Sequence, residues 1–597
     1  MNVAQSTDTS VADAYLALLS ARGVDYFFGN AGTDFPPIIE AFAKAAAHGH
    51  KVPTPVVVPH ESVAVAMAHG YYQMTGRAQA VMVHVHVGTA NAICNIINAA
   101  DQKVPILFTA GRTPVHEEGP AGARNRVIHW AQEMYDQAGM LRMHVKWDYE
   151  LRSAAQLRTV VDRAFQMAMS EPRGPVYLTL PREAIAAPFD GAIDRAPSRL
   201  RPAPASLPHP DEIARAAAMI ASAKTPLIVT ADVGRHPASV PALEAFAERF
   251  AIPVVQHHPR FHNIGFDHPM YLGALPGALL KEADLVLAVE CDVPWLPSLE
   301  QPQAGANVIQ LALDPVFARE PIRGFAADAV LTGTAEHALP QLAAALETEI
   351  DPASIAARRE RLAERRAAFV RGLDARLEAG KARRPIDVGW ATRCIAERCG
   401  GDAIYVGESA FEPDQARLNR PGSFFRLTPA GGLGWGLGAA LGTKLACRDR
   451  LVVAPLGDGA YIFNNPVAAH YVSQAENLPI LAIVFNNGGW EAVRRANRSM
   501  YPQGLTVQSN RQPLSDFTID NPFEKIVETY GGYGVRVEDP ADLPKALDDA
   551  LHAVQVEGRQ ALINLITARR LTAAKNKRKA GREPGLSRSA LRAAQYR

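Results

Sequence analysis

Two stretches in the last third of the chain decide the fold: LVVAPLGDGAYIF at residues 451–463 and LAIVFNNGGW at residues 481–490. Each begins with a continuous apolar run, which is typical of a strand buried on both faces of a parallel sheet. Each run then ends in polar and glycine residues, at Gly457-Asp458-Gly459 and at Asn486-Asn487. The carboxyl ends of parallel strands meet at one edge of the sheet, where ligands bind. The sequence therefore predicts a parallel α/β domain with a ligand site at these two turns.

The same alternation of apolar runs and helical patterns recurs along the chain. Helical patterns at residues 61–75 and 89–101 separate the runs nearest the N-terminus. Continuous apolar strands that alternate with helices indicate parallel sheets covered by helices on both faces. The further apolar runs lie at residues 55–59, 80–85, 105–110, 226–231, 285–290, 308–313 and 403–407.

Two connectors divide the chain. Residues 186–210 hold six prolines, and because proline interrupts helices and ladders, this stretch is predicted to be extended. Residues 351–380 form a predicted charged helix, capped near Asp351 and ended by Gly380. We therefore predict three doubly wound α/β domains with parallel sheets, at residues 1–190, 205–350 and 375–568, followed by a basic tail at residues 569–597.

Composition excludes several classes of protein. Of the 597 residues, 48% are hydrophobic and 21% are charged, which argues against disorder and fibrous repeats. The tail holds ten Lys and Arg against one Glu, so the rest of the chain has 52 basic and 60 acidic residues. This mildly acidic body is atypical of nucleic-acid-binding proteins, and we expect no nucleic acid as a partner. The tail fits a solvated extension, a lid over the active site or a surface for an acidic partner.

Cysteine usage and the N-terminus point to a reducing compartment. The five cysteines are widely spaced and form no CxxC pair, so neither a disulfide framework nor a zinc site is predicted. The N-terminus lacks the basic and apolar regions of a signal peptide. There is also no apolar run of about 18 residues that could span a membrane. We expect a cytoplasmic protein that does not bind membranes.

The turns that follow the runs at residues 451–456 and 481–485 have the chemistry of a magnesium–diphosphate site. Asp458 offers a carboxylate oxygen, Asn487 an amide oxygen and Gly489 a backbone carbonyl. Mg²⁺ prefers oxygen ligands in octahedral geometry and keeps phosphate oxygens and water among them. Gly459 lets the backbone approach a phosphate closely. The alternative is a tight turn at Asp458 and an unrelated Asn-Gly turn.

GDG followed by NN at this spacing resembles the metal-binding signature of thiamine diphosphate enzymes, in the branch with acetolactate synthase, benzoylformate decarboxylase and pyruvate decarboxylase. The resemblance covers nearly the whole chain, in the order pyrimidine-binding, central and diphosphate-binding domain. It implies thiamine diphosphate and Mg²⁺ as cofactors. The cofactor-binding residues that it implies are Glu61, Ser409, Gly432, Leu433, Gly457, Gly459, Ala460, Asn487 and Trp490, and the metal ligands are Asp458, Asn487 and Gly489.

The segment PVVVPHESVAVAMAHGYYQMTG at residues 55–76 supports the resemblance. It places Glu61 directly after a predicted strand, at the start of a helix, where the family has its activating glutamate. The resemblance implies that Glu61 hydrogen-bonds to the N1′ nitrogen of the cofactor's aminopyrimidine, so that the imino tautomer can remove the C2 proton of the thiazolium. Taken by itself, without the GDG and NN motif, Glu61 is better interpreted as a first-turn acid stabilised by the helix dipole.

Two further segments resemble benzoylformate decarboxylase. GNAGTDFPP at residues 29–37 matches a substrate loop and places Thr33 at the position of a substrate-contacting serine. VHVHVGTANAICNIINA at residues 83–99 places His84 on the active-site histidine. His84 and His86 are two apart in a predicted strand, so both are expected to face the same side of it. For both histidines, a hydrogen-bonded role inside the core is the alternative.

The segment RPGSFFRLTPAGGLGWGLGAALG at residues 420–442 resembles the part of the family that supports the bent cofactor. Leu433 matches the bulky residue beneath the thiazolium, with ordinary core packing as the alternative. A bent cofactor brings the imino nitrogen next to C2, which is a proximity effect.

The chain also departs from its relatives. CDVPWLP at residues 291–297 lacks the second active-site histidine of benzoylformate decarboxylase, and the first domain lacks the His-His doublet of pyruvate decarboxylase. The histidines of QHHPRFHN at residues 256–263 are expected in a solvated loop, with a pocket lining as the alternative. TADVGRHP at residues 230–237 lacks the glycine-rich turn of the flavin-binding members, so FAD is not expected.

The resemblance implies the formation or cleavage of a C–C bond next to a carbonyl. We expect decarboxylation of a small 2-oxo acid, followed by release of an aldehyde or ligation to an acyloin. His84, with His86 or Thr33, would relay protons and contact the carboxylate. The alternatives are a flavin-containing synthase or oxidase, an acyloin, diketone or acyl-CoA lyase, and a non-catalytic regulatory homologue. In the family the active sites lie between subunits, which implies a homodimer or homotetramer.

Overall fold

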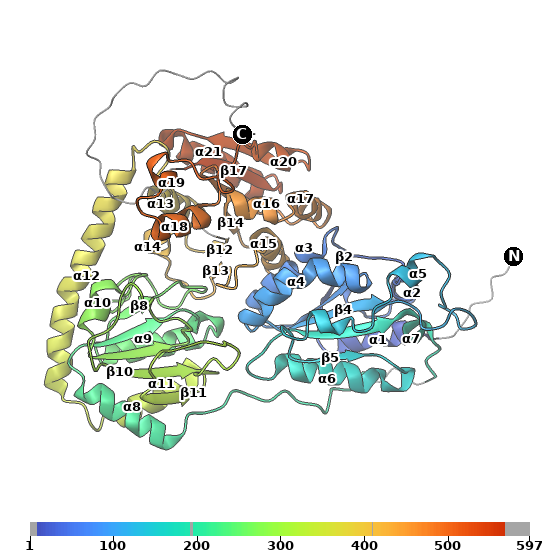
Figure 1. Ribbon diagram of the computed structural model, residues 1–597, viewed down its shortest axis with the longest axis horizontal. Helices are drawn as coiled ribbons and strands as arrows, with labels where there is room; N and C mark the ends of the chain where they lie inside the picture. The colour runs from blue at the N-terminus through green and yellow to red at the C-terminus, as the bar shows by residue number, and fades with distance from the viewer. Residues whose placement is uncertain (1–8, 191–194, 409, 568–597) are drawn as a thin grey trace.

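Three parallel sheets organise the chain (Figure 1). The computed structural model describes residues 9–190, 195–408 and 410–567. Each sheet pairs all its strands in parallel, as the continuous apolar runs predicted. Helices lie on the faces of each sheet, so the predicted α/β class with three doubly wound domains is confirmed. Ser409 and the predicted basic tail at residues 569–597 lie outside the described residues.

The first and third sheets share one strand order. The first is ordered β2-β1-β3-β4-β6-β5 and the third β13-β12-β14-β15-β17-β16. In the first sheet the strands are β1 (Tyr26–Gly29), β2 (Thr54–Val57), β3 (Gln79–Val83), β4 (Ile106–Arg112), β5 (Asp148–Glu150) and β6 (Val176–Pro181). In the third they are β12 (Ile404–Gly407), β13 (Phe424–Arg426), β14 (Val452–Gly457), β15 (Leu481–Asn486), β16 (Tyr533–Val537) and β17 (Ala561–Ile566). The two outer domains are thus built on the same plan.

The central sheet has the order β11-β10-β9-β7-β8. Its strands are β7 (Pro226–Thr230), β8 (Val254–Gln256), β9 (Leu285–Val289), β10 (Asn307–Ala312) and β11 (Ala329–Thr332). Its helices are α8 (Pro210–Ser222), α9 (Ser239–Arg249), α10 (Gly277–Glu282) and α11 (Ala335–Leu346). No helix or strand interrupts the described residues between Ala186 and Pro210, as the prolines there predicted.

The outer sheets carry the remaining helices. Those of the first domain are α1 (Val11–Ala21), α2 (Pro36–His48), α3 (Glu61–Thr75), α4 (Val85–Asp101), α5 (Ile128–Ala131), α6 (Leu157–Met169) and α7 (Arg182–Ala186). Those of the third are α13 (Val388–Cys399), α14 (Pro413–Ala416), α15 (Gly436–Ala446), α16 (Asp458–Phe463), α17 (Pro466–Ala475), α18 (Glu491–Met500), α19 (Leu505–Gln508), α20 (Glu524–Glu528) and α21 (Leu543–Gln555). The long helix α12 (Pro352–Gly380) connects the central and third domains, and the side chain of Asp351 caps its first turn.

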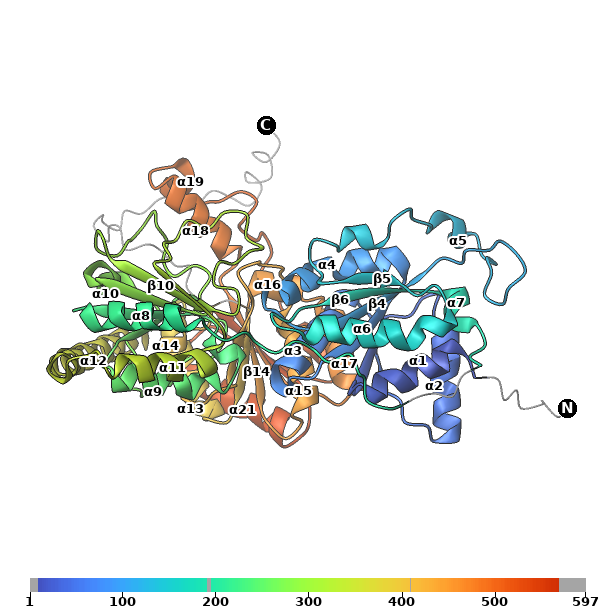
Figure 2. The same cartoon turned by 90° about the horizontal axis from the view of Figure 1, so that it is seen from below.

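Helix α3 of the first domain and helix α15 of the third pack directly against each other (Figure 2). Three glycines make this close approach possible. A Cβ atom at Gly70 would lie 2.0 Å from the carbonyl oxygen of Ala439, and one at Gly442 would lie 1.9 Å from that of Met67. At Gly438 it would lie 2.8 Å from Ala66 Cβ. The buried side chains of the two domains therefore form one continuous core.

The boundaries predicted for one helix agree with the structure, and those predicted for another differ from it. The predicted helix at residues 61–75 is α3, which ends at Gly76 in a left-handed conformation. The helix predicted at residues 89–101 begins four residues earlier, because β3 ends at Val83 and α4 starts at Val85. In the described part of the chain, none of the helices combines the length and apolarity needed to cross a bilayer.

Candidate active site

The predicted metal turns converge at the carboxyl ends of two neighbouring strands. Asp458 follows β14 and Asn487 follows β15, and these strands pair in parallel. The Asp458 carboxylate accepts hydrogen bonds from the backbone N–H groups of Gly459 (2.8 Å), Gly488 (2.8 Å) and Gly489 (3.0 Å). The two turns are therefore hydrogen-bonded into one structure.

The donor set of this structure fits a hard divalent cation. Asp458 is only 2% exposed. Burial raises the pKa of Asp458, and the backbone N–H groups around it lower that pKa only in part. A buried carboxylate without a cation partner is costly. Asn487 and Gly489 belong to the loop whose backbone N–H groups donate to Asp458, and an amide oxygen and a backbone carbonyl are ligand types that Mg²⁺ takes.

Glycine is required at position 459. A Cβ atom there would lie 2.2 Å from the indole of Trp490. That indole packs edge-on against Phe463 and Phe517 at 5.4 and 5.1 Å between ring centroids. Gly457 ends β14, and Ala460 is buried in the first turn of α16. The predicted cofactor-binding residues Gly457, Gly459, Ala460 and Trp490 thus lie together around the Asp458 turn.

Leu433 lies in a loop that is fixed from two sides. From its own domain, the buried Glu408 carboxylate accepts hydrogen bonds from the N–H groups of Gly434 (2.7 Å), Trp435 (3.1 Å) and Gly436 (2.7 Å). The side chain of Asn464 donates to the same carboxylate at 2.7 Å. Burial raises the pKa of Glu408, while these donors lower it. Glu408 was not identified from the sequence.

The first domain holds the loop from the other side. Asn98 of α4 donates to the carbonyl of Gly432 at 2.7 Å and accepts from its N–H at 3.1 Å. Asn95 donates to the carbonyl of Gly434 at 3.2 Å. Gly434 has φ +95°, and a Cβ atom there would lie 2.3 Å from the Phe463 carbonyl. Leu433, half-buried in this loop, is therefore presented by a rigid backbone.

Glu61 lies in the first turn of α3 and is 8% exposed. The side chain of Asn91 donates to Glu61 Oε2 at 3.2 Å. A Cβ atom at Gly88 would lie 3.3 Å from Glu61 Oε1 and 2.9 Å from Val83 Cβ. The carboxylate is thus held at the carboxyl end of the first sheet, with a glycine leaving room beside it.

The partly buried His84 pairs with the buried Asp34, a residue that was not predicted from the sequence. His84 Nδ1 lies 2.5 Å from Asp34 Oδ1, and the N–H of Val85 donates to Asp34 Oδ2 at 3.3 Å. His84 Nε2 lies 3.1 Å from the side-chain nitrogen of Gln132, also unpredicted. Burial disfavours the charged imidazole, but the hydrogen bond and charge of Asp34 outweigh burial, so the pKa of His84 is raised.

The expectation that His84 and His86 share one face of a strand is wrong. β3 ends at Val83, His84 caps α4, and His86 lies in the first turn of that helix. Residues two apart in a helix point in different directions. His86 Nδ1 and Thr33 Oγ1 are nevertheless both buried without a hydrogen-bond partner among the described residues. Neither atom's hydrogen-bonding capacity is used by the described residues.

The central histidines are not a solvated loop, contrary to the prediction. His257 is 3% exposed and its Nδ1 lies 2.6 Å from the carbonyl of Val293. His262 is 5% exposed, and burial lowers its pKa to about 4. His258 remains exposed. Burial of His257 and His262 favours structural roles for both, and the lowered pKa of His262 favours its neutral form.

Comparison with known proteins agrees with this geometry. Models of the N-terminal, central and C-terminal domains of thiamine pyrophosphate enzymes match residues 9–140, 213–342 and 406–564, which is more than half of the chain. Thiamine pyrophosphate is another name for thiamine diphosphate. The first and last of these models are described as cofactor-binding domains.

Individual relatives are similar over most of their length. Benzoylformate decarboxylase of Pseudomonas aeruginosa is 28% identical over 81% of this chain and 87% of its own. A probable 2-ketoarginine decarboxylase of the same species is 28% identical over 81% and 83%. The large subunit of acetolactate synthase isozyme 3 of Escherichia coli is 25% identical over 92% and 93%.

A solved structure shows the same fold. The crystal structure of benzoylformate decarboxylase from Polynucleobacter necessarius superposes with a TM-score of 0.74 at 21% identity, over 94% of this chain and 99% of that chain. The family models, the relatives and the converging turns at Asp458 and Asn487 agree. The chain belongs to the family of thiamine pyrophosphate enzymes.

Proposed function

We propose that the protein decarboxylates a small 2-oxo acid with thiamine diphosphate and Mg²⁺, and releases an aldehyde or ligates the product to an acyloin. The observation that carries this proposal is the Asp458 turn joined to the Asn487 loop, together with Glu61 at the end of the first sheet. The similarity to benzoylformate decarboxylase and to a probable 2-ketoarginine decarboxylase supports a 2-oxo acid as the substrate class.

The residues of the third domain would hold the cofactor's diphosphate end. Asp458, Asn487 and the carbonyl of Gly489 would bind Mg²⁺, which in turn binds phosphate oxygens. Leu433, on its fixed loop, would support the bent cofactor. When bound, thiamine diphosphate supplies a thiazolium ring that accepts the electrons left behind as carbon dioxide departs.

The residues of the first domain would manage protons and the substrate. Glu61 would hold a proton at its carboxyl group, in hydrogen-bond contact with the aminopyrimidine. The raised pKa of His84 favours an imidazolium that binds the substrate carboxylate and can donate a proton from Nε2. Thr33 Oγ1 and His86 Nδ1, both without partners among the described residues, would complete the polar contacts.

The substrate class can be tested by proton NMR of the purified holoenzyme. Pyruvate and an aryl 2-oxo acid would be supplied separately, with thiamine diphosphate and Mg²⁺ present. Consumption of either acid with appearance of an aldehyde or an acyloin supports the proposal, and the product distinguishes protonation from ligation. If neither acid nor any other 2-oxo acid of a panel is consumed while the cofactor binds, the proposal is wrong.

We further propose that two copies of the chain form each active site. The residues that hydrogen-bond to Glu61 and His84 belong to the first domain. The residues that hydrogen-bond to Asp458 belong to the third domain. A groove beside these elements runs from His60 to α16 and α17. Apolar side chains near it are exposed, among them Val57 (66%), Ile462 (43%) and Val467 (60%). Such a patch is typical of a subunit interface.

Mixing two inactive variants tests this arrangement. Glu61→Gln and Asp458→Asn would be inactive alone. If each site combines the first domain of one copy with the third domain of the other, a hybrid dimer has one intact site. Co-refolding equal amounts is then expected to restore about a quarter of wild-type activity. If the site lies within one chain, every site carries a substitution and no activity returns.

A further inference from the structure

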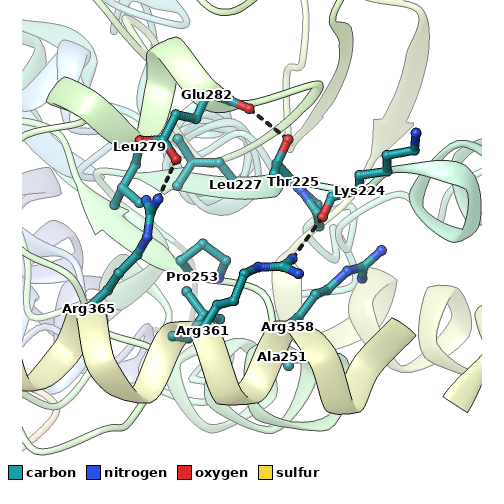
Figure 3. A pocket seen from close by; sticks show the side chains of 12 residues that line it. Lys224, Thr225, Leu227, Ala251, Pro253, Leu279, Glu282, Arg358, Arg361 and Arg365 are labelled. Atoms are coloured by element: carbon teal, nitrogen blue, oxygen red, sulfur yellow. Dashed lines mark hydrogen bonds and ion pairs between the residues drawn. The ribbon is translucent and has the colours of Figure 1, made fainter. Parts of the chain in front are cut away.

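A pocket with both apolar and basic lining lies far from the residues described above (Figure 3). It lies between the first half of α12 and the loops that precede β7 and β8. These loops are at the amino-terminal edge of the central sheet, opposite the edge where ligands of doubly wound domains usually bind. Nothing in the proposed catalytic mechanism uses this pocket.

One face of α12 forms a wall of the pocket. Arg358, Arg361, Leu362 and Arg365 line it, and their spacing of three and four residues places them on the same side of the helix. Leu362 is 6% exposed and packs into the core of the central domain. Leu227 and Leu279 line the pocket from the sheet side and from α10. The pocket therefore has an apolar floor beneath basic side chains.

The basic side chains outnumber the acids that could neutralise them. Arg365 forms an ion pair with Glu282. Arg361 donates to the carbonyl of Lys224 at 3.4 Å, which leaves its charge uncompensated. Among the described residues, no ion pair involves Arg361, Arg358 or the Lys224 ammonium group. The Asp284 carboxylate, which faces Arg358, accepts the backbone N–H groups of Lys224 and Thr225.

Arg358 has a donor that lacks an acceptor. This side chain is 4% exposed, and its Nη2 donates to the carbonyl of Ala223. Its Nη1 is buried and has no hydrogen-bond partner among the described residues. Buried donors of this kind are rare because leaving them unpaired is costly. An acceptor at Nη1 would relieve this cost, and an anionic one would also balance the charge.

We propose that this pocket binds a small organic anion. Its carboxylate or phosphate group would accept hydrogen bonds from Arg358 and Arg361 and would lie near Lys224. Its apolar body would lie on Leu227, Leu279 and Leu362. The far end of α12 contacts the third domain, where the side chain of Gln415 donates to the carbonyl of Leu373 at 3.3 Å. A ligand in the pocket would therefore contact both the central domain and α12, which reaches the third domain. It would stabilise the packing of α12 against the central domain.

The test uses the full chain saturated with thiamine diphosphate and Mg²⁺, so that the catalytic phosphate site is already filled. Phenyl phosphate, benzoate and inorganic phosphate serve as anionic probes, and benzyl alcohol is the neutral control. Binding is followed by calorimetry and by the thermal midpoint. Phenyl phosphate and benzoate separate a phosphate ligand from a carboxylate ligand, and inorganic phosphate tests the need for an apolar body.

Two variants assign any binding to this pocket. Arg361→Gln removes an exposed charge with little structural consequence, and Arg358→Met keeps the buried stem while removing the guanidinium. Arg371→Gln, at an exposed position further along α12, is the matched control. We expect saturable binding of an aryl anion, weakened about tenfold or more in Arg361→Gln and Arg358→Met and unchanged in Arg371→Gln. The proposal is overturned if no anionic probe binds saturably, if benzyl alcohol binds equally well, or if Arg361→Gln binds like the wild type.

Discussion

His84 pairs with the buried Asp34 at 2.5 Å between Nδ1 and Oδ1, although 50 residues separate them in the chain. Two glycines make room for the pair. A Cβ atom at Gly32 would lie 2.2 Å from the imidazole, and one at Gly111 would lie 1.8 Å from Asp34 Oδ2. The pair fixes the orientation of the imidazole and favours a proton on Nδ1. The second ring nitrogen, Nε2, lies next to Gln132, and under the proposed function it is the atom that would exchange a proton with a substrate.

Replacing Asp34 by Asn is expected to move the pH profile of the reaction. Without the negative partner the pKa of His84 falls, so the imidazolium is lost at a lower pH. The alkaline limb of the kcat/KM profile should shift by about one pH unit toward acid. At pH values above this limb, kcat/KM should be about tenfold lower than in the wild type. The measurement is kcat/KM from pH 5 to 9. Asp136→Asn, at an exposed ion pair with Arg142, is the control; an unchanged limb in Asp34→Asn would show that His84 is not the titrating group.

Replacing Asp458 by Asn is expected to weaken Mg²⁺ binding at least about a hundredfold, because a charged ligand becomes neutral. Thiamine diphosphate binding should weaken with it. The indole of Trp490 lies against Gly459, so its fluorescence can report occupation of the site. Stripping the wild type with EDTA should cause the same loss, and added Mg²⁺ should reverse it only in the wild type. Asp449→Asn, exposed on the surface, should behave as wild type. Equal Mg²⁺ affinity in Asp458→Asn would place the metal elsewhere.

Replacing Glu408 by Gln is expected to loosen the loop that carries Leu433. The amide can accept fewer hydrogen bonds than the carboxylate, which takes four. The free energy of unfolding should fall by about 2–3 kcal/mol. The Kd for thiamine diphosphate should rise more than kcat falls at saturating cofactor, because Glu408 acts through the loop. Glu378→Gln on the exposed part of α12 is the control. A large loss of kcat without a change in Kd contradicts this role.

Placing a methyl group between α3 and α15 is expected to weaken the packing of the first domain against the third domain. In Gly70→Ala and Gly442→Ala, the new Cβ would overlap backbone carbonyls of the facing helix. Because backbone cannot move aside as a side chain can, we expect a loss of about 3 kcal/mol or more in urea unfolding. Gly372→Ala, in α12 with open space around it, should instead stabilise the protein by about 0.5–1 kcal/mol. Equal stability in Gly70→Ala and wild type would mean that the helices are not in close contact.

Much of the fold was predictable because its signals are local. The apolar runs that became β7, β9, β14 and β15 are continuous and bounded by polar residues. The meeting of the Asp458 and Asn487 turns was predictable because both residues follow such runs, whereas their binding of Mg²⁺ stays a prediction. The start of α4 was not, because it requires Val85 at φ +32°, a conformation that no sequence rule favours for a β-branched residue.

Other parts of the site depend on contacts between residues far apart in the chain, which spacing and hydrophobic pattern do not reveal. Glu408 caps a loop 26 residues later in the chain, and Gln132 approaches His84 from an irregular segment. Asp34 directly follows Thr33 in the loop at residues 29–37, but nothing in its spacing indicated a contact with His84.

The most direct test of the account is the release of carbon dioxide from a 2-oxo acid labelled with ¹³C at its carboxyl group. The wild type and Glu61→Gln would be compared at saturating thiamine diphosphate and Mg²⁺, with cofactor binding confirmed for both. We expect labelled carbon dioxide from the wild type and a rate at least about a hundredfold lower from Glu61→Gln. A Glu61→Gln variant as active as the wild type, or a wild type that binds cofactor and releases no label from any 2-oxo acid, would contradict it.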